Sequence, residues 1–356
     1  MNKRRFKRRK RKHPILKLLF WICFLGAAFV IYRSYKLTFK DNVSAEKETV
    51  LFIPTGATYE AVVDSLKAKG LLKDFFAFDV VAKLKSYPEL VRAGKYKIGP
   101  DMSNNDLINM FRSGSQELVK VQFNTVENIE QLAGVIAEQI EADSLDLLVS
   151  MYSNNYNRYN INEKNLSCLY IPNTYEFYWN TDAEGFVRRM ILEFETFWNE
   201  DRRRKAADLN LSLPEVVTLA SIVQKEVLRK DELPVVAGLY LNRLRRGMKL
   251  QADPTVIFAL KKELNPDTVI KRVLYKDLRF ESEYNTYIHK GLPPGPICLP
   301  SVRSIDAVLN STSHNYLYMC AKEDFSGYHN FAATAREHNI NKRKWTRALN
   351  ERRIMR

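Results

Sequence analysis

The hydrophobic and polar positions of the chain separate one long apolar run from a series of amphipathic segments. The long run extends from Pro14 to Tyr32 and is interrupted only by Lys17. About twenty apolar residues span a bilayer as a helix, and the amphipathic side chains of Trp21 and Tyr32 suit a membrane boundary. The pattern predicts a single transmembrane helix at 14–32. A cleaved signal peptide, with Gly26-Ala27-Ala28 as its small residues, is the less favoured interpretation.

Residues 33–49 are polar and charged, and the segments after this tether carry short strand and helix patterns. Their order, strand, helix, helix, strand, predicts a compact α+β module. Ser103 and Asp106 form a capping-box pattern for one more helix through Phe111. A strand and a helix then repeat the start of the module weakly. The predicted strands are 50–53, 94–98 and 119–123, and the predicted helices are 59–69, 75–85 and 129–140.

The remaining chain predicts a larger domain. Residues 183–205 form one long amphipathic helical pattern and residues 233–246 another. Residues 143–162 begin as a helix and become a polar, Asn-rich loop, while residues 169–181 are aromatic and rich in turn formers. The expected fold class is therefore α+β: a transmembrane helix, a small module with part of a second, and a larger mixed α/β domain.

A helix predicted at 213–230 carries the strongest candidate for chemistry. Ser212 can cap it, Pro214 suits its first turn, and apolar residues recur along it at helical spacing, so that one stripe faces a core. Glu226 lies at the edge of that stripe, where lost hydration would raise its pKa toward neutrality and make it a proton donor. The alternative is an ordinary surface ion pair with Lys230, one turn on. The helix taken alone favours the ion pair.

Most of the excess charge lies before the apolar run. The chain has a formal net charge of +15, and nine basic residues fall between Met1 and His13. By the positive-inside rule this basic segment stays in the cytoplasm, and the chain from about Arg33 onward is exported. Nucleic-acid binding loses its support, because the exported part is only mildly basic.

The cysteines do not form a disulfide framework. Cys23 lies in the apolar run, and Cys168, Cys298 and Cys320 are widely spaced without a C-x-x-C motif. The fold must therefore depend on its hydrophobic core. A single disulfide bond between two of the three exported cysteines is left as an open alternative.

Three later stretches combine polar side chains with turn formers: 250–255, 284–296, and 329–331 with 338–339. Amides, hydroxyls and aromatic faces on rigid turns suit a sugar, which needs hydrogen bonds and a stacking surface. His329 and His338 are nine residues apart with no acid at ligand spacing, so turn hydrogen bonding is expected of them, and neither a metal nor a cofactor is predicted.

Several of these motifs together carry a family resemblance. They are Ala220-Ser221-Ile222-Val223, Lys225-Glu226, Asn242-Arg243-Leu244, Leu250-Gln251, Asp253-Pro254-Thr255-Val256-Ile257, Tyr284-Asn285-Thr286-Tyr287 and Gly291-Leu292-Pro293-Pro294-Gly295. In this order and spacing the chain resembles the MltG (YceG-like) family of endolytic murein transglycosylases. The resemblance covers nearly the whole exported chain. It implies a membrane anchor, a LysM-like region and a catalytic domain.

The resemblance implies that Glu226 is the catalytic acid of a lytic transglycosylase. Relatives often have a second acid where this chain has Gln224. Glycoside hydrolases normally use two carboxylates, whereas in lytic transglycosylation the sugar's own C6 hydroxyl is the nucleophile and closes a 1,6-anhydro ring. Candidate substrate contacts are Gln251, Asn285 and Tyr287. Asp253 is expected to orient the substrate or to act on it through its charge. For each of these four a structural role in a turn or loop remains open.

The expected organisation is a cytoplasmic basic segment (1–13), a transmembrane helix (14–32), a tether (33–49), a LysM-like region with a weak second half-repeat (50–141) and a catalytic domain (142–356). The expected function is cleavage within nascent peptidoglycan strands by a single-pass protein of the inner membrane, with its catalytic domain in the periplasm or, in a bacterium without one, on the outer face. Peptidoglycan synthases are expected partners. The alternative is a non-catalytic scaffold that binds peptidoglycan or synthesis enzymes.

Overall fold

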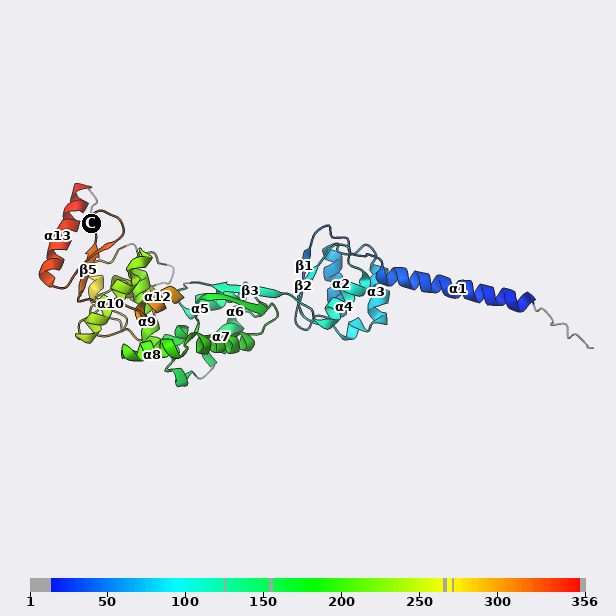
Figure 1. Ribbon diagram of the computed structural model, residues 1–356, viewed down its shortest axis with the longest axis horizontal. Helices are drawn as coiled ribbons and strands as arrows, with labels where there is room; N and C mark the ends of the chain where they lie inside the picture. Colours follow the sequence, from blue (N-terminus) through cyan, green and yellow to red (C-terminus); the bar gives the residue numbers. More distant parts are fainter. Residues whose placement is uncertain (1–13, 125, 154–155, 265–267, 271, 353–356) are drawn as a thin grey trace, which may run out of the picture. The chain divides into compact units, whose positions relative to one another are not determined.

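The computed structural model describes residues 14–124, 126–153, 156–264, 268–270 and 272–352, so the predicted basic segment lies outside them. By their internal contacts they form two compact units (Figure 1). Unit 1 contains the residues up to Leu118 with Tyr178–Asn180, and unit 2 contains Val119–Phe177 with the residues from Thr181 onward. The predicted catalytic domain begins at residue 142, inside unit 2, and the assignment of domains remains a prediction.

The described helices and strands follow one another in a mixed order, and the strands pair in twos as β1–β2, β3–β4 and β5–β6. The elements are α1 (Pro14–Phe39), β1 (Thr49–Ile53), α2 (Tyr59–Ala68), α3 (Phe75–Leu84), β2 (Gly94–Ile98), α4 (Asn104–Ser113), β3 (Leu118–Phe123), α5 (Ile129–Ala137), α6 (Ser144–Ser153), β4 (Asn173–Tyr178), α7 (Ala183–Phe197), α8 (Glu200–Asp208), α9 (Leu213–Glu226), α10 (Leu233–Arg245), α11 (Asp253–Leu264), α12 (Val302–Leu309), β5 (Tyr318–Ala321), β6 (His329–Ala332) and α13 (Ala335–Glu351).

Unit 1 has the predicted strand, helix, helix, strand order. Strands β1 and β2 pair antiparallel, with Thr49 opposite Ile98, and the side chains that alternate inward join α2, α3 and α4 in one core. The predicted capping box is confirmed, because Ser103 and Asp106 bond each other at the start of α4. Among the most buried residues of this core are Leu51, Phe78, Tyr96 and Phe111.

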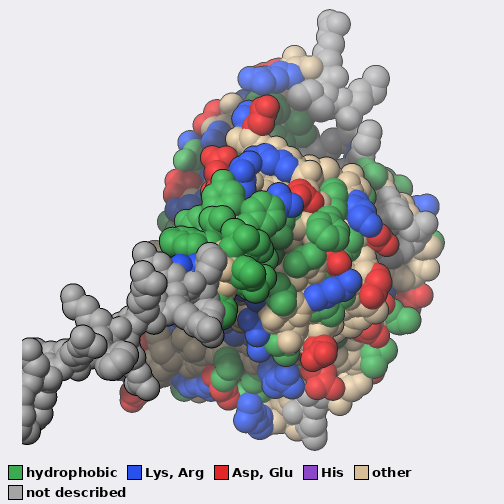
Figure 2. Space-filling view, turned by 90° about the vertical axis from the view of Figure 1, so that its right-hand side faces the viewer, with side chains coloured by type: hydrophobic (Ala, Val, Ile, Leu, Met, Phe, Trp, Pro, Cys, Tyr) green, Lys and Arg blue, Asp and Glu red, His purple; other side chains and the backbone are tan. Residues whose placement is uncertain are grey.

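Helix α1 exposes its apolar side chains along its length. Among the described residues it is the one helix that is by itself long and apolar enough to cross a membrane. Its large hydrophobic residues from Ile15 to Tyr35 are 53–72% exposed, whereas Leu37 packs against the core of unit 1. Figure 2 views the molecule from the side on which Figure 1 draws α1 and shows a cluster of hydrophobic side chains there. The helix continues to Phe39, beyond the predicted end at Tyr32, since polar residues after the apolar run still favour a helix. An exposed apolar helix of this kind is consistent with a single-pass membrane anchor.

Unit 2 is built around α9. Every residue from Val216 to Val223 is buried, because α8, α10, α11 and α12 all contact this helix. The expectation of a single apolar stripe was therefore wrong: helices cover α9 on several sides. Its predicted start is confirmed, with the Ser212 N–H donating to the Glu215 carboxylate at 2.8 Å.

Three other predictions for unit 2 need correction. The long helix at 183–205 is two helices, α7 and α8, because Asn199 caps the second one. The turn-rich stretch at 169–181 contains strand β4, which pairs with β3. Asp253 opens helix α11 instead of a turn.

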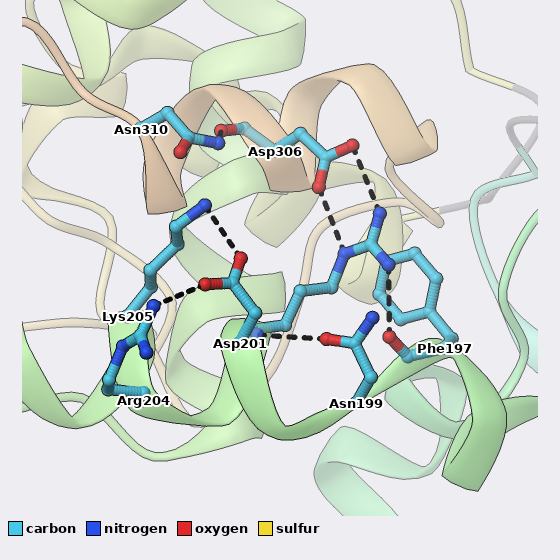
Figure 3. A network of polar contacts seen from close by, with 8 residues as sticks. Phe197, Asn199, Asp201, Arg204, Lys205, Asp306 and Asn310 are labelled. Atoms are coloured by element: carbon cyan, nitrogen blue, oxygen red, sulfur yellow. Dashed lines mark hydrogen bonds and ion pairs between the residues drawn. The ribbon is translucent and has the colours of Figure 1, made fainter.

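A polar network joins α12, one of the helices packed around α9, to α8 (Figure 3). Arg202 on α8 donates two hydrogen bonds to the Asp306 carboxylate on α12, at 3.1 and 3.3 Å, and a third to the Phe197 carbonyl oxygen. Asp201 pairs with Arg204 and Lys205 beside it. Because the Arg202–Asp306 pair is bidentate and partly buried, it holds α8 and α12 in a defined register.

Candidate functional site

Glu226 is the last residue of α9, where the helix ends at the border of the core. The next residue, Val227, is extended, and Lys230 begins a separate 3-10 turn (Lys230–Glu232). The helical i,i+4 ion pair between Glu226 and Lys230 therefore cannot form. Glu226 is half-buried, and the burial raises its pKa.

Tyr240 on α10 holds the Glu226 carboxyl group. The Tyr240 hydroxyl donates a hydrogen bond of 3.0 Å to Glu226 Oε1, and the tyrosine is only 2% exposed. Burial raises the pKa of Glu226 to about 7, with a smaller upward contribution from the charge of Asp253 that offsets part of the lowering by Tyr240. Burial also raises the pKa of Tyr240 well above its usual value, so its hydroxyl stays a donor. A pKa near neutrality lets Glu226 be protonated at the pH at which the protein works, which is the state required of a general acid.

Asp253 and Tyr287 lie together beside Glu226. The Tyr287 hydroxyl donates to Asp253 Oδ1 at 2.5 Å, and the charge of Asp253 acts on both Tyr287 and Glu226. Asp253 is exposed and Tyr287 half-buried. The fold thus places a second carboxylate and a phenol near the candidate acid.

Buried hydroxyls join the loops that carry these residues. The Ala252 N–H donates to Thr286 Oγ1 at 3.1 Å, and Thr255 Oγ1 lies 2.9 Å from the same oxygen. The Gln251 N–H donates to the Thr286 carbonyl oxygen at 3.1 Å. The Gln251 side chain is exposed, and its backbone has a positive φ of 51°, which is uncommon for a residue other than glycine. The exposed amide of Gln251 is therefore available to a ligand on a braced loop.

The side chain of Asn285 is bonded within its own loop, the structural role that the sequence left open for it. It is 0% exposed, and its amide nitrogen donates to the carbonyl oxygens of Leu278 and Phe280. Its amide oxygen accepts the Tyr287 N–H at 2.9 Å. Because both ends of the amide are bonded to backbone, a direct contact between Asn285 and a substrate does not fit this geometry. Asn285 holds the loop that presents Tyr287.

Two residues of the site, Tyr240 and Arg243, were missed by the sequence analysis. Arg243 is 8% exposed and donates to the carbonyl oxygens of Leu250 and Leu317, each at 2.6 Å. Its positive charge lowers the pKa of Glu226. Arg243 belongs to the Asn242-Arg243-Leu244 motif, for which the sequence predicted no role in the site. A tyrosine and an arginine three residues apart, among the aliphatic positions of 233–246, were the available signal.

Gln224 occupies a structural position. Its amide oxygen accepts the Ser301 N–H at 2.7 Å and the Ser304 hydroxyl at 2.8 Å, at the start of α12. It therefore joins α9 to the first turn of α12. A carboxylate at this position could accept the same two hydrogen bonds.

The two histidines noted in the sequence, His329 and His338, lie in a strand and a helix and not in turns. His329 lies on β6, and its Nδ1 is 2.8 Å from the carboxylate of the buried Glu232. His338 lies on α13 and stacks on Tyr318. The expectation of turn hydrogen bonds was wrong for both, because each sits in a regular element. In the described part of the chain, no three His, Cys, Asp or Glu side chains converge as a metal site.

Comparison with known proteins gives consistent matches. Residues 51–344 match the model of the YceG-like family. The chain is 28% identical over 350 residues to the endolytic murein transglycosylase of Bacillus subtilis (strain 168), covering 92% of each chain. It is 25% identical over 339 residues to the enzyme of the same name in Streptococcus pneumoniae (strain ATCC BAA-255 / R6), covering 86% of this chain and 60% of the pneumococcal one.

A solved structure gives the same result. The crystal structure of a putative yceG-like protein from Listeria monocytogenes superposes with a TM-score of 0.52 at 25% identity. The match covers 83% of this chain and 99% of the Listeria chain. Since the family model matches well over half of the sequence, the chain belongs to the YceG-like family.

Proposed function

We propose that this protein is a membrane-anchored lytic transglycosylase that cleaves within peptidoglycan glycan strands, with Glu226 as its only general acid–base residue. The observation that carries the proposal is the Glu226 carboxyl group, half-buried, bonded by Tyr240 and with a pKa raised to about 7. The murein transglycosylase names of the relatives supply the substrate class.

In the proposed reaction Glu226 first acts as an acid. It donates its proton to the oxygen that links C1 of N-acetylmuramic acid to the next sugar, and that C1–O bond breaks. The carboxylate then accepts the proton of the C6 hydroxyl as O6 bonds to C1, which closes a 1,6-anhydro ring and restores the acid. Tyr240 holds Oε1 in place throughout. The nearby negative charge of Asp253 would stabilise positive charge developing on the sugar.

The remaining roles follow from the same proposal. Gln251 and Tyr287 would contact the glycan, while Asn285 would act indirectly by holding their loops. The basic segment would stay in the cytoplasm and α1 would cross the inner membrane, with the rest of the chain outside. We assign a LysM-like, peptidoglycan-binding role to residues 50–141, and the strand, helix, helix, strand order of β1, α2, α3 and β2 supports it for the part of that region in unit 1.

The product ends test this function. Intact peptidoglycan digested with the purified protein should release fragments that end in 1,6-anhydro-N-acetylmuramic acid, detected by mass spectrometry. Reducing ends would instead indicate a hydrolase. Binding without any cleavage would support a scaffold that holds peptidoglycan or its synthases.

Anchoring at the membrane would confine cleavage to strands that emerge near the peptidoglycan synthases, so the enzyme would end strand elongation. Deletion of the gene should therefore lengthen the glycan strands, as measured by chromatography of amidase-treated peptidoglycan. An unchanged length distribution would contradict this role while leaving the chemistry intact.

Substitution of Tyr240 by Phe should shift the pH dependence of kcat/KM. In the wild type, kcat/KM should fall as the pH rises through about 7, because the protonated acid is lost. The Tyr240 hydrogen bond lowers the pKa of Glu226, so its removal should move this fall to higher pH and reduce the maximum, since Oε1 is no longer held. A profile that keeps its midpoint would show that Tyr240 does not act on the acid.

A further inference from the structure

A cluster of basic side chains surrounds a cavity of ≈ 380 Å³ at the end of α1. Arg33 and Lys36 come from α1, Lys40 directly follows the end of that helix, and Lys73 comes from the segment just before α3. Residues spaced three apart lie on one face of a helix, so Arg33 and Lys36 share the face that borders the cavity. The Lys40 N–H donates to the Lys36 carbonyl oxygen at 3.2 Å, which places Lys40 at the end of the last turn. Among the described residues, none of these four cations takes part in an ion pair with a carboxylate.

The carboxylates of the cavity balance this charge only in part. Asp41 and Asp74 also line it, which leaves an excess of two positive charges from four cations and two acids. The Asp74 carboxylate already accepts the Ala77 N–H at 3.0 Å as the cap of α3. The cavity therefore presents a net positive charge.

The cavity is part of a fixed structure in unit 1. The Asn104 side chain donates to the Leu37 carbonyl oxygen of α1 at 2.8 Å, and the same side chain accepts a hydrogen bond of 2.7 Å from buried Asn42. Helix α1 also packs against α3 and α4. These contacts hold the end of α1 against the part of unit 1 that carries Lys73, so all four cations line one cavity.

The position of the cavity along α1 favours a ligand at the membrane surface. The apolar run of 14–32 is about 28 Å long as a helix, which matches a hydrocarbon core of about 30 Å. Arg33 would lie at the edge of that core and Lys36 about 5 Å beyond it, within the headgroup region that contains the lipid phosphates, while the long side chain of Lys40 can reach back to that region. Basic residues on the exported side of a span also oppose the positive-inside rule, so their presence there calls for a role other than topology.

We infer that this cavity binds the phosphate group of an anionic membrane lipid in the outer leaflet. The inference depends on the proposed membrane insertion of α1 but not on the chemistry of Glu226. The bound phosphate would fix unit 1 against the membrane surface, because Lys73 is in the body of the unit while Arg33 and Lys36 are on the anchor helix.

Lipid retention by the full-length protein tests the inference. The protein is purified in neutral detergent, given equal amounts of phosphatidylglycerol and phosphatidylcholine, and examined by native mass spectrometry. The wild type should retain phosphatidylglycerol preferentially. Lys40→Gln combined with Lys73→Gln should reduce this retention by roughly tenfold or more. The matched control is Lys47→Gln with Lys69→Gln, two exposed lysines of the same unit that do not line the cavity, and it should retain lipid as the wild type does.

The outcomes separate the inference from the proposed function. Equal retention by the two double variants, or equal retention of the two lipids by the wild type, would overturn the lipid site. Complete displacement by inorganic phosphate would assign the cavity to a soluble anion instead. Release of the wild type from membranes by alkaline carbonate would overturn the anchor itself. Peptidoglycan cleavage should be unchanged in both double variants, since none of the four lysines is in the candidate active site.

Discussion

Glu226→Gln should reduce peptidoglycan cleavage by about 100- to 10,000-fold, the range for loss of a general acid–base residue. Glutamine can still accept the Tyr240 hydrogen bond, so the site keeps its shape and loses only the transferable proton. No second carboxylate occupies position 224 to replace it, and Gln224 is directed to α12. The rate of anhydro-end formation measures the loss, and binding of peptidoglycan should be unaffected.

Two controls make this result interpretable. Glu263→Gln changes an exposed glutamate at the other end of α11 and should leave the rate unchanged. Stability gives a second control, because the folded-state pKa of Glu226 is raised to about 7 from an ordinary 4.5. The wild type therefore loses stability as the pH rises through this interval, and Glu226→Gln does not. The variant should be more stable than the wild type at pH 8, by about 1–3 kcal/mol, and nearly equal below pH 4.5. A stable variant with full activity would refute Glu226 as the acid.

Gly295→Ala should destabilise the protein by about 3 kcal/mol or more. A methyl group at Gly295 would lie 2.1 Å from the Lys164 carbonyl oxygen and 2.9 Å from its carbonyl carbon. Both atoms are backbone, so the contact cannot be relieved by a rotamer change. The loop would have to leave the segment around Lys164, which would also strain the hydrogen bond of 3.0 Å from the Ile297 N–H to Ser221 Oγ on α9.

Thermal unfolding measures this effect, and a decrease in Tm of roughly 6–12 °C is expected. Gly134→Ala is the matched control, because Gly134 lies inside helix α5 with nothing within 4 Å of an added methyl group. Alanine should stabilise that position by up to about 1 kcal/mol. If the two variants unfold at the same temperature, close packing is not the reason for glycine at 295.

Local patterns in the sequence were sufficient for the elements whose signals are local. The capping residues at Ser103 and Ser212 and the short strand patterns at 50–53 and 94–98 each predicted an element that the structure contains. The break between α7 and α8 was missed because an Asn within an amphipathic pattern is compatible with a continuous helix until tertiary packing favours a cap. Strand β4 was missed because its pairing partner, β3, lies about fifty residues earlier.

The sequence by itself determined the long apolar helix, the module after it, the family and the identity of the candidate acid, because each depends on residue type and spacing along continuous segments. Only the tertiary structure decided which groups surround that acid. Tyr240, Asp253 and Tyr287 come from separate segments of the chain. The structure also shows that the Asn285 amide is bonded to the backbone of its own loop. The pKa of Glu226 depends on burial and on charges that only folding brings within a few ångströms, so no reading of residues 213–230 alone could fix it.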